Sequence, residues 1–288
     1  MRWHRAPAKV NLTLDVVGRR TDGFHDLESL VAFAEDSDWL GYSPGRRLEL
    51  TVEGPGAEDA GPIEGNLVAR AARALAARVP DLLLGEFRLI KRLPAGAGLG
   101  GGSSDAAACL RALAEANGLS LSDERVQAAA LETGSDVPVC VPACARMMTG
   151  VGDRLGAPVR LPSLFAVLVN PRQTLPTRDV FAALGMERGF RRSARVGAPL
   201  ARDVSLSVTI EALSAGGNDL EAPAVSLLPT VGVVLDQLKR LSNALVARMS
   251  GSGATCFALF DSPDAARNAK DVLTASYPAW WITTTTLR

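Results

Sequence analysis

The spacing of apolar residues along the chain predicts a mixture of strands and helices. Apolar and polar residues alternate over Val10–Val17 and Phe87–Leu93, as expected for strands with one buried and one wet face. Leu164–Val169 and Cys256–Phe260 are short apolar runs that also predict strands. Apolar residues at helical spacing predict the helices Asn66–Arg78, Ser103–Asn117, Ser122–Thr133, Leu227–Ser242 and Pro263–Ser276. Strands with one polar face favour antiparallel sheets, so the pattern predicts an α+β protein.

Capping and turn-forming residues separate these elements. Asn66, Ser122 and Ser262 precede predicted helices and are candidate N-caps. Residues 41–65 are rich in proline and glycine and predict a hairpin with a loose loop. Residues 185–203 predict a solvated loop or helix face, because they carry Arg188, Arg191, Arg192, Arg195 and Arg202. The pattern changes after about residue 155, so we expect two domains, 1–155 and 156–288.

Composition and charge narrow the class of protein. The 288 residues include 31 Lys+Arg and 31 Asp+Glu, so the chain has no formal net charge and lacks the basic surplus of a nucleic-acid-binding protein. The longest uncharged stretch, residues 272–287, contains a proline and five threonines, which disfavours a membrane span. We expect a soluble cytoplasmic protein, a monomer or homodimer, with no nucleic-acid or membrane partner.

Three residue types limit the possible chemistry. The chain has two histidines, His4 and His25, so it has no multi-histidine metal site. Its four cysteines lack CxxC spacing; Cys140 and Cys144 would suit two metal ligands on a helix, but small buried side chains are the commoner role. Only Lys9, Lys91, Lys239 and Lys270 are lysines, which makes each of them a candidate for a specific role.

The most informative segment is a glycine-rich loop between a predicted strand and a predicted helix. Its backbone N–H groups can converge on an anion, and the helix N-terminus adds further donors and the positive end of its dipole. We therefore predict that it binds a phosphate chain. The predicted phosphate-binding residues are Pro94, Ala95, Gly96, Ala97, Gly98, Leu99, Gly100, Gly101, Gly102, Ser103 and Ser104.

Two nucleotide-binding motifs can be compared with this loop. No glycine is followed directly by lysine, which excludes the P-loop. Gly96, Gly98 and Gly101 match G-x-G-x-x-G, so a nicotinamide-dependent oxidoreductase remains an alternative. Asp123 or Glu124 would then be the acidic residue that hydrogen-bonds to the ribose of the cofactor. The charged residues of the preceding strand disfavour it, because the usual strand is buried on both faces.

Five segments together resemble the GHMP small-molecule kinases. The loop fits P-x-G-x-G-L-G-x-x-S-S, and SGSGA at 250–254 followed by CFALF is similar to another glycine loop of that family. Residues 6–27 (APAKVNLTLDVVGRRTDGFHDL), 134–140 (GSDVPVC) and 145–155 (ARMMTGVGDRL) resemble the members that phosphorylate a cytidyl-linked methylerythritol.

The resemblance implies a two-domain α+β fold and a reaction. The N-terminal domain would carry the nucleotide loop, and the C-terminal domain would be ferredoxin-like. The reaction would transfer the ATP γ-phosphoryl group, with Mg²⁺, to the 2-hydroxyl of a methylerythritol that carries a cytidine diphosphate group, in isoprenoid precursor synthesis. Homoserine or mevalonate as acceptor, and a non-catalytic nucleotide-binding module, are the alternatives.

The resemblance also assigns roles to residues. Asp136 would accept the hydroxyl proton beside Lys9, whose ammonium keeps the carboxylate ionised and stabilises the developing alkoxide. Ser103 or Ser104 would contact Mg²⁺. Phe24, where the family usually has tyrosine, and Phe181 would stack on the cytosine, which His25 would read. The substrate-binding residues implied are Asn11, Phe24, His25, Thr177 and Phe181.

Overall fold

The computed structural model describes residues 1–195 and 204–288, and these residues form two compact units. Unit 1 contains Met1–Lys9, Asp36–Ala95 and Gly100–Ala143, whereas unit 2 contains Val10–Glu35, Gly96–Leu99 and Cys144–Arg288. The division predicted at residue 155 is a single cut, whereas these units interleave along the chain. They do so because the long strands β1 (Arg2–Asn11) and β3 (His25–Ser43) contribute residues to both.

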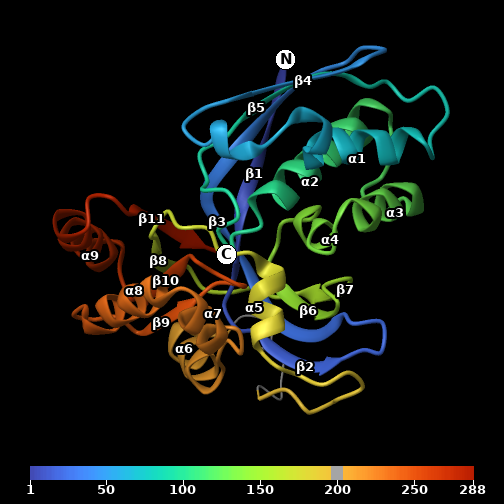
Figure 1. The fold of residues 1–288 in the computed structure, drawn as a ribbon. Helices are drawn as coiled ribbons and strands as arrows, with labels where there is room; N and C mark the ends of the chain where they lie inside the picture. Colours follow the sequence, from blue (N-terminus) through green and yellow to red (C-terminus); the bar gives the residue numbers. More distant parts are fainter. Residues whose placement is uncertain (196–203) are drawn as a thin grey trace. The chain divides into compact units, whose positions relative to one another are not determined.

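Unit 1 combines a small sheet with four α-helices and two short 3-10 helices, Glu58–Ala60 and Ile63–Gly65. Strand β4 (Leu48–Glu53) runs parallel to β5 (Gly85–Ile90), and β5 runs antiparallel to Trp39–Ser43 of β3. Helix α1 packs on α2 and α3, and Figure 1 shows α1 and α2 side by side. The helices are α1 (Leu67–Ala76), α2 (Gly101–Ala116), α3 (Glu124–Thr133) and α4 (Val137–Cys140).

The prediction of a hairpin over residues 41–65 is wrong. β4 pairs with β5 in parallel, and it is β5 that pairs with β3. The parallel register places Leu50 opposite Phe87, and both side chains are buried. Burial of these apolar side chains favours the long-range pairing over the local one.

Two of the predicted helix starts in this unit differ from the structure. The cap at Asn66 is confirmed, because its side chain accepts the Val68 N–H at 2.9 Å. Helix α3 is instead capped by Asp123, which accepts the Arg125 N–H at 2.9 Å, so Ser122 is not the cap. Helix α2 begins at Gly101, two residues before the predicted start, since Gly100 takes the left-handed conformation at the N-cap.

Unit 2 contains two groups of strands. In the first group, the His25–Glu35 part of β3 pairs with β2 (Asp15–Arg19) and β6 (Arg146–Gly150), and β6 pairs with β7 (Arg154–Pro158). The second has the order β11-β8-β10-β9, all antiparallel. Its strands are β8 (Leu164–Asn170), β9 (Val246–Met249), β10 (Cys256–Phe260) and β11 (Trp281–Leu287).

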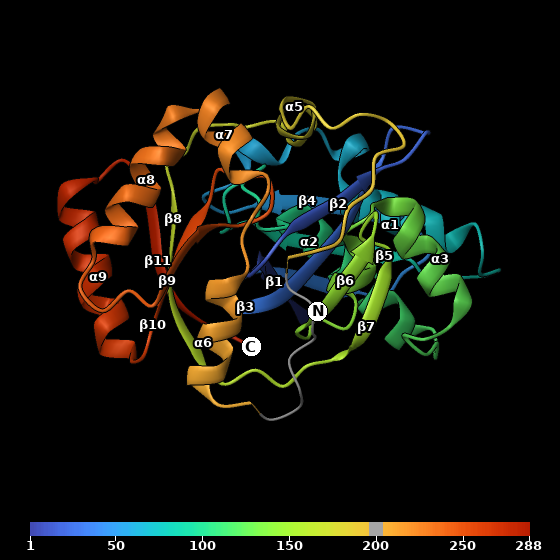
Figure 2. The ribbon, with the colours of Figure 1, turned by 90° about the horizontal axis from the view of Figure 1, so that it is seen from below.

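The helices of unit 2 complete its core. Helices α8 and α9 contact β8–β11 and lie on the same side of these strands in Figure 2. Val167, Leu235 and Phe260 are among the buried residues between these helices and strands. Apart from α5, α6 and α7, which lie between β8 and α8, the order β8-α8-β9-β10-α9-β11 is a β-α-β-β-α-β sequence, and the ferredoxin-like domain stays a prediction. The helices are α5 (Thr177–Ala183), α6 (Leu206–Ala215), α7 (Glu221–Leu227), α8 (Pro229–Arg240) and α9 (Pro263–Ser276).

Three predictions for unit 2 need correction. Val10–Val17 is not one strand, because the Leu12 and Thr13 N–H groups both donate to the Leu30 carbonyl and interrupt the regular pairing with β3 after the end of β1 and before the start of β2. Leu227–Ser242 is divided between α7 and α8, and α8 starts at Pro229. Arg192 and Arg195 form ion pairs and are not simply solvated, whereas Arg202 lies outside the described residues.

No helix in the described ranges is both long and apolar enough to cross a membrane.

Candidate active site

The glycine-rich loop ends in a helix N-terminus with free donor positions. Gly96, Gly98 and Gly100 all have positive φ, which glycine adopts without strain. The first bond of helix α2 runs from the Ser104 N–H to the Gly100 carbonyl at 2.8 Å, so the N–H groups of residues 101–103 precede the helical ladder. Together with the helix dipole, these donors suit a phosphate group.

Lys9 and Asp136 form an ion pair in unit 1. Lys9 Nζ lies 3.0 Å from Asp136 Oδ2; the lysine side chain is 4% exposed and the aspartate side chain 33%. Asp136 is the N-cap residue of α4, and Lys9 lies near the end of β1. A Cβ added to Gly100 would lie 3.1 Å from Lys9 Cε, so the lysine lies beside the N-cap of α2. The structure therefore brings together the predicted base, its lysine and the start of the phosphate-binding helix.

The two predicted serines have different surroundings. Ser104 is fully buried, and its hydroxyl donates to the Pro7 carbonyl at 2.6 Å. That contact joins α2 to β1 and engages the hydroxyl proton within the protein. Ser103 is only partly buried. Of the two serines, Ser103 is therefore the one placed to contact a phosphate or metal ion.

A buried ionic cluster lies behind the start of α2, and the sequence analysis did not identify it. Lys91 Nζ donates to Asp38 Oδ2 and, at 2.7 Å, to Asp105 Oδ2. Asp38 Oδ1 also accepts the Leu93 N–H at 2.9 Å. Burial lowers the pKa of Lys91, but the two carboxylates raise it by more. Burial raises the pKa of Asp105 to about 7, against the opposing effect of Lys91. The scarcity of lysine was the one sequence signal that pointed to Lys91.

In unit 2, residues 96–99 of the glycine-rich loop contact the second glycine loop, SGSGA. The Ser250 hydroxyl donates to the Gly98 carbonyl at 2.9 Å and accepts the Asn11 N–H at 3.1 Å. The Thr255 N–H donates to the Ala97 carbonyl at 3.1 Å. A Cβ on Gly98 would lie 2.4 Å from the Ser250 carbonyl oxygen, so the close approach of these backbones requires glycine there.

Three aromatic residues predicted to bind a base occupy the β2–β3 hairpin and α5. His25 stacks on Phe181, with ring centroids 4.9 Å apart and an interplanar angle of 29°. His25 Nε2 is buried and has no hydrogen-bond partner in the described part of the chain. Burial and the nearby Arg19 guanidinium lower the pKa of His25, which favours a neutral imidazole. Phe24 is 64% exposed at the hairpin tip.

The last two predicted residues lie close to the SGSGA loop. The Thr177 hydroxyl at the start of α5 is 2.8 Å from the Ser252 hydroxyl. Asn11 is buried, and its side chain donates to the Ser29 hydroxyl at 2.7 Å. Both residues therefore have protein partners that fix their side chains.

The described residues contain no group of three or more His, Cys, Asp or Glu side chains that would hold a metal ion alone. Mg²⁺ in phosphoryl-transfer sites is commonly held by substrate phosphates with one or two protein ligands. Ser103, a partly buried serine at the helix N-terminus, fits that smaller role.

The chain is similar to known proteins over nearly its full length. A model of the GHMP kinases N terminal domain matches residues 66–143, and a model of the GHMP kinases C terminal matches residues 205–279. A 4-diphosphocytidyl-2-C-methyl-D-erythritol kinase of Rhodopseudomonas palustris is 52% identical over 288 residues, covering 96% of this chain and 94% of the relative. A kinase of the same name from Methylobacterium radiotolerans is 53% identical over 285 residues, covering 99% and 98%.

A solved structure extends the comparison. A 4-(cytidine 5'-diphospho)-2C-methyl-D-erythritol kinase superposes with a TM-score of 0.75 at 33% identity, covering 99% of each chain. The chain belongs to the GHMP kinase family, and the resemblance found in the sequence is confirmed. Within that family, the relatives described here share the name 4-diphosphocytidyl-2-C-methyl-D-erythritol kinase.

Proposed function

We propose that the chain is an ATP-dependent kinase that phosphorylates the 2-hydroxyl of 4-diphosphocytidyl-2-C-methyl-D-erythritol in isoprenoid precursor synthesis. The observation that carries this proposal is the Lys9–Asp136 ion pair beside the N-cap of α2. It provides a proton acceptor and a cation next to a helix N-terminus that suits phosphate. The relatives above 50% identity support the choice of acceptor.

The reaction needs little from the protein beyond positioning and charge. Asp136 accepts the proton of the acceptor hydroxyl as its oxygen forms a bond to the γ-phosphorus. The bond between that phosphorus and the β,γ-bridging oxygen breaks, and ADP leaves. Lys9 stabilises the negative charge that develops on the attacking oxygen, and the N–H groups at the start of α2 bind phosphate oxygens.

Mg²⁺ would be held by Ser103 and the ATP phosphates. When bound, the ion neutralises charge on the phosphate oxygens. Ser104 is left out of this proposal, because its hydroxyl is buried against Pro7.

The cytidine end of the acceptor would bind to the aromatic residues of unit 2. Phe24 offers an exposed ring face, and His25 has a neutral imidazole with an unpartnered nitrogen that can hydrogen-bond to the edge of a base. The His25–Phe181 contact leaves no room for a third ring between them, so the base would stack on Phe24 or on a free face of Phe181. Homoserine and mevalonate have no base to stack, which weakens those alternatives.

Thr177 and Asn11 would line the acceptor site from two sides of the SGSGA loop. A hydrogen bond to the protein helps to fix each side chain, with Ser252 for Thr177 and with Ser29 for Asn11. A cytoplasmic location and a monomeric or homodimeric state stay predictions.

The test is phosphoryl transfer from γ-labelled ATP with Mg²⁺, with the cytidyl-linked methylerythritol as acceptor. We expect label in the acceptor and a loss of about 100-fold or more in kcat for Asp136→Asn, since general bases contribute at least that much. The Asp136 side chain makes no cap hydrogen bond to α4 and is 33% exposed, so the variant should still fold and bind ATP. Asp123→Asn, which alters the N-cap of α3, is the matched control and should keep full activity. Full turnover in Asp136→Asn contradicts the base assignment, and transfer only to homoserine or mevalonate contradicts the acceptor.

A further inference from the structure

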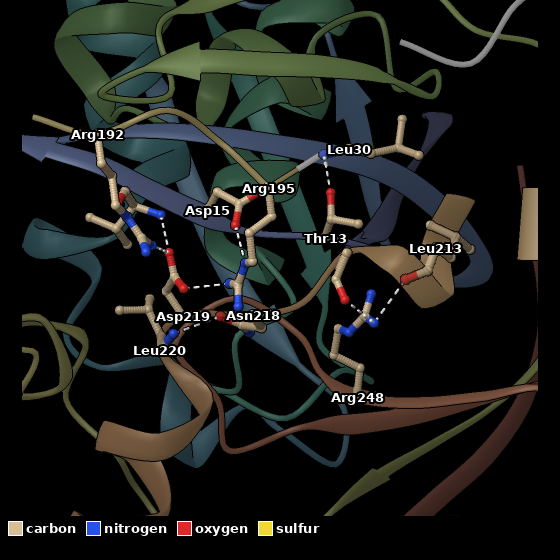
Figure 3. Close-up of polar contacts among 12 residues, drawn as sticks. Thr13, Asp15, Leu30, Arg192, Arg195, Leu213, Asn218, Asp219, Leu220 and Arg248 are labelled. Carbon is tan, nitrogen blue, oxygen red and sulfur yellow. Dashed lines mark hydrogen bonds and ion pairs between the residues drawn. The ribbon is translucent and has the colours of Figure 1, made fainter. Parts of the chain in front are cut away.

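The turn before α7 contacts two different parts of unit 2. Its residues Gly217–Asp219 lie against Leu14: the Leu14 N–H donates to the Gly217 carbonyl at 2.8 Å, and the Asp219 N–H donates to the Leu14 carbonyl at 2.9 Å. The backbone of the turn is therefore fixed on the chain just before β2. Asn218 and Asp219, adjacent in sequence, send their side chains to different partners (Figure 3).

Asn218 holds the SGSGA loop. Its side-chain amide donates to the carbonyls of Met249 and Gly251, both at 2.8 Å. Its side-chain oxygen accepts the Leu220 N–H at 2.9 Å, so the orientation of the amide is fixed. The two carbonyls flank Ser250, whose hydroxyl donates to Gly98 in the phosphate-binding loop. Asn218 thus holds the SGSGA loop directly and the phosphate-binding loop through Ser250. The asparagine itself is only 8% exposed.

Asp219 holds a segment that we call the arginine strap, residues 186–195, which follows α5. Its carboxylate pairs with Arg192 and Arg195, and Figure 3 shows it between their guanidinium groups. Asp219 Oδ2 also accepts the Val16 N–H of β2 at 2.6 Å, and Arg195 Nε donates to Asp15 Oδ1 at 2.7 Å. Two carboxylates and two guanidinium groups balance in charge at this point.

The arginine strap continues along β2 toward the base-binding hairpin. The Arg192 N–H donates to the Val17 carbonyl at 2.8 Å, and the Gly189 N–H donates to the Arg19 carbonyl at 2.7 Å. Arg19 in turn is paired with His25 across β2 and β3. At the other end of the strap, α5 carries Phe181, which stacks on His25. Asp219 therefore anchors both members of the aromatic pair, one through β2 and one through the strap.

We infer that Asn218 and Asp219 are positioning residues with separate targets, Asn218 for the binding of ATP and Asp219 for the binding of the cytidine diphosphate end of the acceptor. This inference rests on the proposed function for the identity of the two ligands. Neither side chain is assigned a contact with a ligand. Each acts through the groups that it holds in place, and the two effects are separable because none of the contacts described above is shared by the two side chains.

The test compares Asn218→Ala and Asp219→Asn by calorimetric binding of a non-hydrolysable ATP analogue and of cytidine 5′-diphosphate, each alone. For Asn218→Ala we expect the Kd of the ATP analogue to rise tenfold or more and that of cytidine diphosphate to stay within twofold. For Asp219→Asn we expect the reverse pattern. The inference would be overturned if the Kd values of both ligands rose equally in either variant, or if neither Kd changed in either variant.

Two control variants distinguish this outcome from a nonspecific loss of protein stability. Asn117→Ala removes an amide that also makes three backbone hydrogen bonds, to Leu83 and Leu113, and should change neither Kd. Asp123→Asn removes an aspartate paired with Arg125 and should also be silent. Should Asn218→Ala fail to fold, Asn218→Ser is held to the same criterion. Because binding is measured without turnover, failure of the wild type to phosphorylate the acceptor would refute the proposed function while this comparison still decides the inference.

Discussion

Replacing Lys91 by methionine should destabilise the protein strongly, although Lys91 makes no proposed contact with substrate. The side chains of Lys91, Asp38 and Asp105 are 5%, 0% and 4% exposed, so the ammonium is the cation that both buried carboxylates contact. Methionine has a similar length but no charge, and it would leave two carboxylates together in the interior. Breaking a buried ion pair from one side typically costs 3–5 kcal/mol of unfolding free energy.

The lower end of that range is expected here. Burial already raises the pKa of Asp105 to about 7, and Lys91 is the group that opposes this shift. Without Lys91 the pKa of Asp105 rises further, and uptake of a proton removes part of the repulsion. We therefore expect a loss of about 3 kcal/mol near neutral pH.

The pH dependence has a definite sign. A buried acid whose pKa is raised in the folded state stabilises the fold less as pH rises toward that pKa, because the unfolded chain releases the proton first. In the wild type this loss ends near pH 7, where Asp105 ionises, but in the variant it continues to higher pH. The difference in stability between wild type and Lys91→Met should therefore be larger at pH 8.5 than at pH 6.

The assay is urea unfolding followed by far-ultraviolet circular dichroism at both pH values, with Arg88→Met as the control. Arg88 lies on β5, which ends one residue before Lys91, but its pair with Glu53 is exposed, with both side chains at 46%. Its removal should leave the unfolding midpoint nearly unchanged. If Lys91→Met lowers the midpoint no more than Arg88→Met does, the cluster does not stabilise the fold and the reasoning is refuted.

Three further outcomes follow from the site. Gly98→Ala should lower the thermal midpoint more than Gly96→Ala: both positions have positive φ, but only the first would place a Cβ within 2.4 Å of a backbone oxygen. Equal midpoints would contradict the close approach. Ser103→Ala should raise the KM for ATP, whereas Ser104→Ala should lower stability with a nearly unchanged KM; the opposite result would exchange their roles. Because burial lowers the pKa of His25, the KM for the acceptor should be flat above pH 6.5 and rise only in more acidic solution, measured from pH 5 to 8.

Local signals in the sequence identified the elements whose structure depends on neighbouring residues. Asn66 caps α1 and Ser262 caps α9 as predicted. Both caps are short-range features, because the side-chain oxygen accepts a backbone N–H only two or three residues further along the chain. The glycine-rich loop was identifiable for the same reason: its conformation depends on glycine at particular positions in one short segment.

Features that depend on distant partners were not predictable from the pattern. β4 and β5 pair in parallel across 31 intervening residues, and nothing within either strand specifies that partner. Asp38 lies 53 positions from Lys91, and Asp219 lies 203 positions from Val16. Asn218 and Asp219 read as ordinary turn residues in a GGND sequence, because asparagine and aspartate favour turns regardless of their partners. Their roles depend on the loops that the fold brings to them.

The two paired lysines of unit 1 show why burial of the partner, more than burial of the lysine, separates a structural ion pair from a catalytic one. Lys9 and Lys91 have side chains exposed by only 4% and 5%, and both are paired with aspartate. The partners of Lys91 are enclosed, so no hydroxyl group of a substrate can reach them and they serve the fold. Asp136 keeps a third of its side chain exposed at the start of α4, where it can accept a proton from outside while its cation stays fixed. A base must meet its substrate, and among these three carboxylates only Asp136 is placed to do so.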